Sequence, residues 1–178
     1  MAGEAEGNLK LYGEVINNTG AAQTLPNVRG TFYDSGGNEI SEGPIVDYLP
    51  LELIPQGGQV PFALTAFGLH EAADFDLQME AEPSQETLQH AFEFLEATSY
   101  ESDGSYCLRA KVHNLGDELH SYLAIVAVLY DEQGNVINFD DHYEHLAEGL
   151  GGQALNFELC VDSLGQTVAS YELRAWGL

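Results

Sequence analysis

Two stretches of the chain repeat one phrase: TFYDSGGNEI spans Thr31–Ile40, and VLYDEQGNVI spans Val128–Ile137. Each reads Tyr-Asp, two residues, Gly-Asn, one residue and Ile. An aspartate at the end of a strand accepts hydrogen bonds from the backbone N–H groups ahead of it and so begins a turn. A glycine supplies the positive φ that closes a bulged hairpin, and the isoleucine resumes the next strand. The phrase therefore predicts the same hairpin turn at two places in the chain.

The similarity extends over most of the chain. Both copies alternate apolar and polar residues with a period of two, as strands buried on one face do. No helical pattern separates these strands, so a parallel sheet with helical crossovers is not expected. The sequence therefore predicts an all-β protein of two tandem Ig-like antiparallel β-sandwich domains, residues 1–82 and 91–178, with residues 83–90 as the linker. Further pairs match at shifts of 95 to 97 residues: Leu11 with Leu108, Val15 with Val112, Asn17 with Asn114, Val60–Leu64 with Leu155–Leu159, and Phe75–Met79 with Tyr171–Ala175.

Three segments of the first copy resemble the FxLYD domain: GEVINNTG (Gly13–Gly20), FYD (Phe32–Asp34) and IPQGGQVPF (Ile54–Phe62). The name-giving motif falls on residues 30–34 and 127–131. Leu-Tyr-Asp is intact in the second copy, Phe replaces Leu in the first, and the leading Phe is missing from both. The resemblance implies a short Ig-like β-sandwich of the kind found in bacterial or archaeal envelope and secreted proteins. It implies no catalytic residue.

The stretch AFEFLEATSYE, Ala91–Glu101, predicts a first strand for the second copy. Glu6–Asn8 aligns with Asp103–Ser105, so the counterpart of that strand in the first copy would precede Met1. Two interpretations remain open: the strand was removed together with an N-terminal extension, or the first domain never had it. Either leaves an open sheet edge in the first domain, where another chain could add a strand.

The chain is strongly acidic, with 29 Asp and Glu, 5 Lys and Arg, and a net charge of −24. The acidic residues are spread evenly along the chain, since the net charge is −11 before Pro83 and −13 after it. Such a surface repels nucleic acid and anionic lipid. Solubility or adaptation to a salty medium explains it, and a surface for a basic partner or for cations is the alternative. No apolar run is long enough to span a membrane, and no export signal lies in this chain.

The most polar stretch is NFDDHYEHL, Asn138–Leu146. On a strand, His142 and Glu144 would share one face, and an imidazole and a carboxylate two residues apart could bind zinc or another divalent ion. A solvated acidic strand is the alternative. The repeated turns, in contrast, lack the alternating carboxylates and distal Glu of a calcium loop. The candidate metal ligands are Asp140, Asp141, His142, Glu144 and His145.

Two cysteines fall on strands that an Ig-like sandwich makes antiparallel neighbours. Cys107 begins one strand and Cys160 ends the other, so the start of one meets the end of the other, and both side chains point away from the core. We expect their Cα atoms to lie within roughly 7 Å. A disulfide would fit an oxidising compartment. Two free thiols are the alternative, because cross-strand geometry is strained for a disulfide.

Motifs of catalysis do not occur: there is no Gly-x-Ser-x-Gly, phosphate loop or dinucleotide fingerprint. We therefore expect no enzyme and no cofactor. The sequence favours a non-enzymatic binding or spacer module that is secreted or anchored to the cell envelope and does not itself span the membrane. Its partner would be an unknown protein or envelope component and not nucleic acid. The alternative is a divalent-metal or small-ligand binding protein that uses Asp140–His145.

Overall fold

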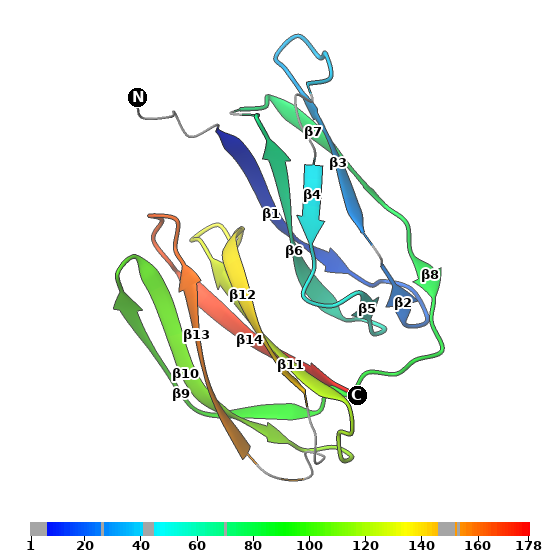
Figure 1. Ribbon diagram of the computed structural model, residues 1–178, viewed down its shortest axis with the longest axis vertical. Helices are drawn as coiled ribbons and strands as arrows, with labels where there is room; N and C mark the ends of the chain where they lie inside the picture. The colour runs from blue at the N-terminus through cyan, green and yellow to red at the C-terminus, as the bar shows by residue number, and fades with distance from the viewer. Residues whose placement is uncertain (1–6, 26, 41–44, 70, 146–151, 153) are drawn as a thin grey trace. The chain divides into compact units, whose positions relative to one another are not determined.

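The computed structural model describes residues 7–25, 27–40, 45–69, 71–145, 152 and 154–178. Within these ranges the chain is all-β, with antiparallel sheets and no helix (Figure 1). The predicted sandwich-type all-β fold is confirmed. The chain divides into two compact units, residues 1–85 and 86–178.

The second unit is a sandwich of two three-stranded sheets, with strand orders β13-β10-β9 and β12-β11-β14 (Figure 1). Its strands are β9 (Phe92–Ser102), β10 (Ser105–Asn114), β11 (Tyr122–Tyr130), β12 (Val136–His145), β13 (Ala154–Asp162) and β14 (Ser170–Gly177). Apolar side chains from both sheets form one core because alternate residues of each strand face inward. These buried residues are Leu108, Ala110, Val112, Leu119, Leu123, Ile125, Ala127, Leu129, Ile137, Phe157, Leu159, Val161 and Ala175.

The first unit has sheets with strand orders β1-β6-β4, β3-β7 and β5-β2-β8. Its longest pairing joins β1 to β6, and Phe32, Ala66 and Leu69 form a buried cluster within the unit. Its last strand, β8, spans the predicted boundary between the first domain and the linker. The described strands are β1 (Asn8–Ile16), β2 (Gln23–Thr24), β3 (Val28–Tyr33), β4 (Ile45–Tyr48), β5 (Leu53–Ile54), β6 (Gln59–Phe67), β7 (Asp74–Met79) and β8 (Glu82–Pro83).

The two units share the register of their main strand pairs. Lys10 of β1 lies opposite Thr65 of β6, and Cys107 of β10 lies opposite Cys160 of β13. These are the positions that the sequence repeat aligns. The β3/β7 pair likewise corresponds to β11/β14. Duplicated sequence is therefore matched by duplicated hydrogen-bond ladders.

Two features separate the units. β10 pairs with β13 on one side and β9 on the other, whereas β1 pairs with β6 alone among the described residues. In addition, β12 pairs with β11, while β4, which aligns with the end of β12 in the sequence, pairs with β6. The equivalent segment has thus moved to the opposite sheet.

The repeated phrase forms the predicted turn in the first unit. The Asp34 carboxylate accepts hydrogen bonds from the backbone N–H groups of Gly36 and Asn38 at 2.8 and 2.9 Å and from the Asn38 amide at 3.0 Å. Gly37 has a φ of 78°, which favours glycine. The hydrogen bonds from Asn38 lower the pKa of Asp34 below its ordinary value.

The second unit forms the same turn with the same pattern of hydrogen bonds. Asp131 accepts from the N–H groups of Gln133 and Asn135 at 2.9 and 2.8 Å and from the Asn135 amide at 2.9 Å, and Gly134 has a φ of 81°. The hydrogen bonds from Asn135 lower the pKa of Asp131. Both carboxylates are thus committed to closing a hairpin.

The tyrosine before each of these aspartates has a repeated partner on the neighbouring strand. The Tyr33 hydroxyl donates to Asp76 at 2.9 Å, and this hydrogen bond raises the pKa of Tyr33. The Tyr130 hydroxyl lies 3.5 Å from the equivalent Glu172 and accepts a hydrogen bond from Arg174 at 2.8 Å. In the Leu-Tyr-Asp motif the apolar residue therefore fills the core, the tyrosine reaches the next strand, and the aspartate caps the turn.

A buried asparagine is a further repeated element. The Asn17 amide donates to the carbonyl oxygens of Ala21, Ile54 and Pro55 at 2.9, 2.9 and 3.1 Å, and its oxygen accepts from the Thr19 N–H at 3.0 Å. These contacts join the end of β1 to the last residue of β5 and the residue after it.

Its counterpart in the second unit is Asn114, which is 2% exposed. The Asn114 amide donates to the Asp117 carbonyl at 2.7 Å, and its oxygen accepts from the Gly116 N–H at 3.0 Å. Buried side-chain amides need such partners, so each asparagine fixes the loop that follows its strand.

Candidate functional site

The predicted metal-binding stretch lies on β12 and is divided between the two faces of the strand. His142 and Glu144 come together, with 3.3 Å between Nε2 and Oε2. Partial burial raises the pKa of the nearby Asp140. Within the described ranges, no three His, Cys, Asp or Glu side chains gather closely enough to hold a metal ion. The structure thus brings together one imidazole–carboxylate pair from the five predicted ligands.

The other face of β12 carries an aromatic cluster. Tyr143 stacks on Tyr122 of β11, with 4.8 Å between ring centroids and 22° between the ring planes. His145 meets Tyr143 edge-on at 4.9 Å. His145, a predicted metal ligand, therefore packs edge-on against Tyr143.

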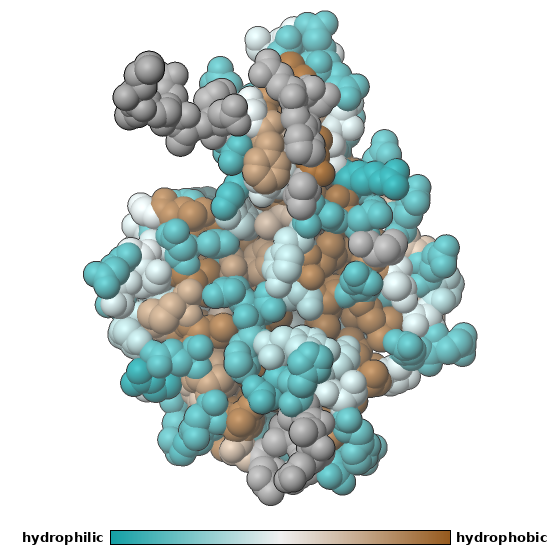
Figure 2. Space-filling view, in the orientation of Figure 1, coloured by the Kyte–Doolittle hydropathy of each residue, from teal (hydrophilic) through white to brown (hydrophobic). Residues whose placement is uncertain are grey.

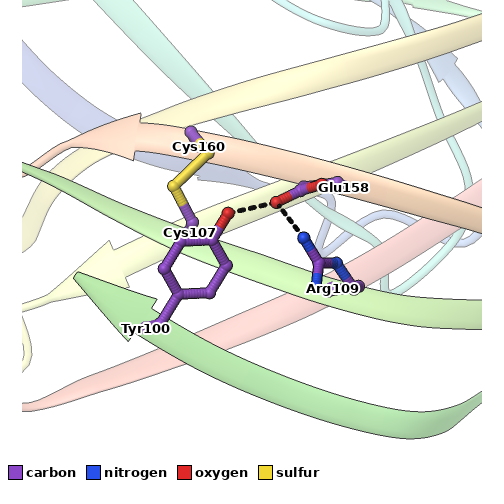
Figure 3. Close-up of a disulfide and its surroundings, with 5 residues drawn as sticks. All are labelled: Tyr100, Cys107, Arg109, Glu158 and Cys160. Carbon is purple, nitrogen blue, oxygen red and sulfur yellow. Dashed lines mark hydrogen bonds and ion pairs between the residues drawn. A yellow bond between two sulfur atoms is a disulfide. The ribbon is translucent and has the colours of Figure 1, made fainter. Parts of the chain in front are cut away.

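The cysteines form the best-defined polar site of the second unit (Figure 3). Cys107 and Cys160 lie directly opposite each other on β10 and β13, with 4.0 Å between their Cα atoms, and are joined in a disulfide. The predicted proximity of the two cysteines is thus observed. Their environments differ, because Cys107 is 2% exposed whereas Cys160 is exposed.

Three charged or polar side chains surround this disulfide. The Tyr100 hydroxyl donates to Glu158, and the Arg109 guanidinium binds the same carboxylate at 2.9 Å (Figure 3). Arg109 also lies 5.6 Å from the centroid of the Tyr100 ring, as in a cation–π contact. The hydrogen bonds from Tyr100 and then Arg109 lower the pKa of Glu158. In turn the Glu158 carboxylate raises the pKa of Tyr100.

Tyr100 covers the buried half of the disulfide. It lies on β9 directly opposite Cys107, so the two strands that flank β10 supply Tyr100 on one side and Cys160 on the other. Sequence reasoning missed Tyr100 and Glu158. Their signal was the outward parity that they share with the cysteines on adjacent strands.

The disulfide indicates an oxidising environment, since reducing compartments keep most thiols free. In the part of the chain that the structure describes, no helix is long and apolar enough to cross a membrane. Hydrophilic side chains are scattered over the visible face of each unit rather than collected in one patch (Figure 2). This distribution agrees with the even spread of acidic residues along the sequence.

No family model, curated protein or solved structure matches the chain.

The free side of β1 is the second candidate site. In the second unit the corresponding side of β10 is covered by β9, whose Phe92 and Phe94 pack against the core. The same side of β1 has no paired strand among the described residues. A strand edge of this kind is a template for hydrogen bonding to another extended chain.

Proposed function

We propose that the protein is a non-enzymatic extracytoplasmic binding module, secreted or attached to the cell envelope, that binds a partner by accepting a strand along β1. The observation that carries the proposal is the difference between the two copies of one unit. In the second copy the strand edge is completed by β9, and in the described part of the first copy no strand pairs with that edge. The resemblance to FxLYD domains favours the same cellular setting.

Burial supports this assignment. Leu108 and Val112 of β10 are 1% and 0% exposed, and Val112 lies opposite Phe94 of β9. Their counterparts on β1, Leu11 and Val15, are only half-buried. An added strand would therefore bury apolar side chains that already face the core, as well as pair backbone groups. Main-chain pairing supplies affinity in strand addition, and pockets for alternate side chains supply specificity.

Charge defines the class of partner. Residues before Pro83 carry a net charge of −11, so an acidic strand would meet repulsion and a basic strand attraction. The partner is thus an extended polypeptide in which apolar residues alternate with lysine or arginine.

A peptide of residues 91–102 provides the test, because β9 already pairs with the equivalent strand of the second unit. In the probe, lysine replaces the three glutamates of that segment. We expect saturable binding to the full chain by fluorescence anisotropy, with amide chemical shifts changed along β1. The unaltered acidic peptide should bind more weakly at low salt, and added salt should narrow the difference.

The matched control is the same lysine peptide with alternate backbone N-methyl groups. It keeps every side chain and its charge but cannot donate the ladder hydrogen bonds of a strand. Equal binding by the methylated and unmethylated peptides would show nonspecific charge attraction and refute strand addition. Shift changes at β12 instead of β1 would do the same.

A further inference from the structure

We propose that Cys107–Cys160 is an exchangeable disulfide, in which the exposed residue Cys160 is attacked by small thiols that are neutral or carry a positive group. The thiol becomes linked to Cys160, and Cys107 is the leaving group. This makes Cys160 a site of reversible covalent modification. It does not rest on strand addition at β1.

The two ends of the disulfide differ in access. Thiol–disulfide exchange requires a thiolate to approach one sulfur from the side opposite the S–S bond. Among the described residues β13 is an edge strand, so the line from Cys107 through Cys160 leads off the sheet into solvent. On the other side of β10, Tyr100 of β9 lies beside Cys107 (Figure 3), and Cys107 is 2% exposed. A thiolate therefore reaches the exposed Cys160 more readily than the buried Cys107.

The fold does not depend on this bond. The first unit pairs the same two strands in the same register with Lys10 opposite Thr65. In the second unit the β10/β13 ladder runs from Ser105 to His113. Neither cysteine belongs to the apolar cluster between the two sheets of this unit. Opening the bond therefore leaves the hydrogen-bonded sheet in place.

Two carboxylates lie on the same strand as Cys160. Glu158 and Asp162 lie two residues before and after Cys160 on the same face of β13. Arg109 offsets part of this charge but is bound to Glu158. An incoming thiolate that carries a carboxylate is repelled by this surface, and one that carries an ammonium group is not. The surface thus selects thiols by their charge.

The chemistry balances without a cofactor. The thiolate donates its electron pair to Cys160 Sγ, the S–S bond breaks, and its electron pair goes to Cys107 Sγ, which takes a proton from water. A second thiolate can then attack the sulfur of the bound thiol, releasing Cys160 as a free thiol and the reagent as its own disulfide. Two thiols supply the two electrons of that full reduction.

Three small thiols of different charge test the selection: cysteamine, 2-mercaptoethanol and 3-mercaptopropionate. Exchange is stopped with an alkylating agent, and mass spectrometry maps the adduct and the alkylated cysteine. Rates are expressed per thiolate and divided by the rate with a neutral small disulfide. The Debye length is about 30 Å at an ionic strength of about 10 mM. Under these conditions we expect the normalised exchange rate of cysteamine to exceed that of 3-mercaptopropionate by about tenfold. The ratio should fall towards one in high salt.

Variants test the direction of attack. Wild-type protein should carry the adduct on Cys160, and Tyr100→Ala should allow adducts on Cys107 as well. Thr98→Ala, on the same face of β9, should leave the wild-type pattern unchanged. Glu158→Gln should increase the rate of exchange with 3-mercaptopropionate more than the rate with cysteamine.

Four results would overturn the proposal. One is an adduct on Cys107 in the wild-type protein. Another is exchange that occurs only at urea concentrations that unfold the second unit. The third is a reactivity order identical to that of the neutral reference disulfide. The fourth is loss of the fold, measured by circular dichroism, in the double variant Cys107→Lys/Cys160→Thr, which copies Lys10 and Thr65 of the first unit.

Discussion

Replacing Asn17 with alanine should destabilise the first unit by about 2–4 kcal/mol. The substitution removes an amide that contacts three carbonyl oxygens and accepts the Thr19 N–H. Because the side chain is 4% exposed, water does not freely replace these partners. The change is small in volume, so the lost hydrogen bonds should dominate over any loss of packing.

The magnitude follows from the burial of the partners. The hydrogen bond from Asn17 to the Ile54 carbonyl is buried. A buried acceptor that loses its donor costs about 1–3 kcal/mol. The Ala21, Pro55 and Thr19 contacts are partly solvated, so together they add about 1 kcal/mol. For a unit of this size such a loss lowers Tm by roughly 10–20 °C.

Urea unfolding followed by circular dichroism measures the loss, and hydrogen-exchange mass spectrometry locates it. Protection should fall in β1, β5 and the turn between β5 and β6. The matched control is Asn18→Ala, because Asn18 is the adjacent asparagine and is exposed. If both variants change the free energy of unfolding by less than about 0.5 kcal/mol, the reasoning about buried amides is wrong.

Other predictions address charge, pH and metal. Raising NaCl from low concentration to about 0.5 M should raise Tm by screening self-repulsion, and CaCl₂ of equal ionic strength should do no more; a larger gain with millimolar calcium would indicate specific sites. Hydrogen bonds from Asn135 lower the pKa of folded Asp131. The contribution of Asp131 to the free energy of unfolding is therefore present above the ordinary pKa of 3.8 and is lost as pH falls through the folded pKa. Asp131→Asn should therefore lower Tm at pH 7 (a neutral amide cannot replace the carboxylate), and the difference should vanish in strong acid; a pH-independent difference would contradict this. Isothermal titration with zinc should show no saturable site, since His142 and Glu144 supply only two ligands; a 1:1 isotherm abolished by His142→Ala would establish the metal-binding alternative.

Local features of the fold could be predicted from the sequence because their causes are local. The turns at Asp34 and Asp131 depend on a few consecutive residues, and both form with the same hydrogen bonds. Alternation likewise gave the outward direction of Cys107 and Cys160, since the side-chain period of a strand is two. The repeat then supplied the correspondence between strand pairs.

Pairing partners were less predictable. The residues of β4 and the end of β12 align, yet β4 joins β6 and β12 joins β11. Alternation identifies a strand but not which of two sheets it joins. The two-residue strands β2, β5 and β8 are too short to carry a pattern at all.

The cluster around the disulfide was missed for a related reason. Tyr100 lies opposite Cys107 because the turn at Asp103 and Gly104 joins β9 directly to β10, and the one-residue register shift lies farther from that turn, between Arg109 and Lys111. Alternation gives the face on which a side chain lies, but its neighbours across strands depend on the register of the pairing. The His142–Glu144 pair, in contrast, needed only the period of one strand.

Equal register in the two units has a consequence for folding. A nascent chain with two interchangeable strand pairs can assemble wrongly, as tandem repeats do when strands exchange between copies. Pairing β10 with β6 would set Cys107 against Thr65 and leave both thiols free, whereas pairing β10 with β13 lets them oxidise. The disulfide therefore marks the molecules in which β10 has paired with β13. The number of free thiols after oxidative refolding counts the molecules in which the repeat has paired with the wrong copy of itself.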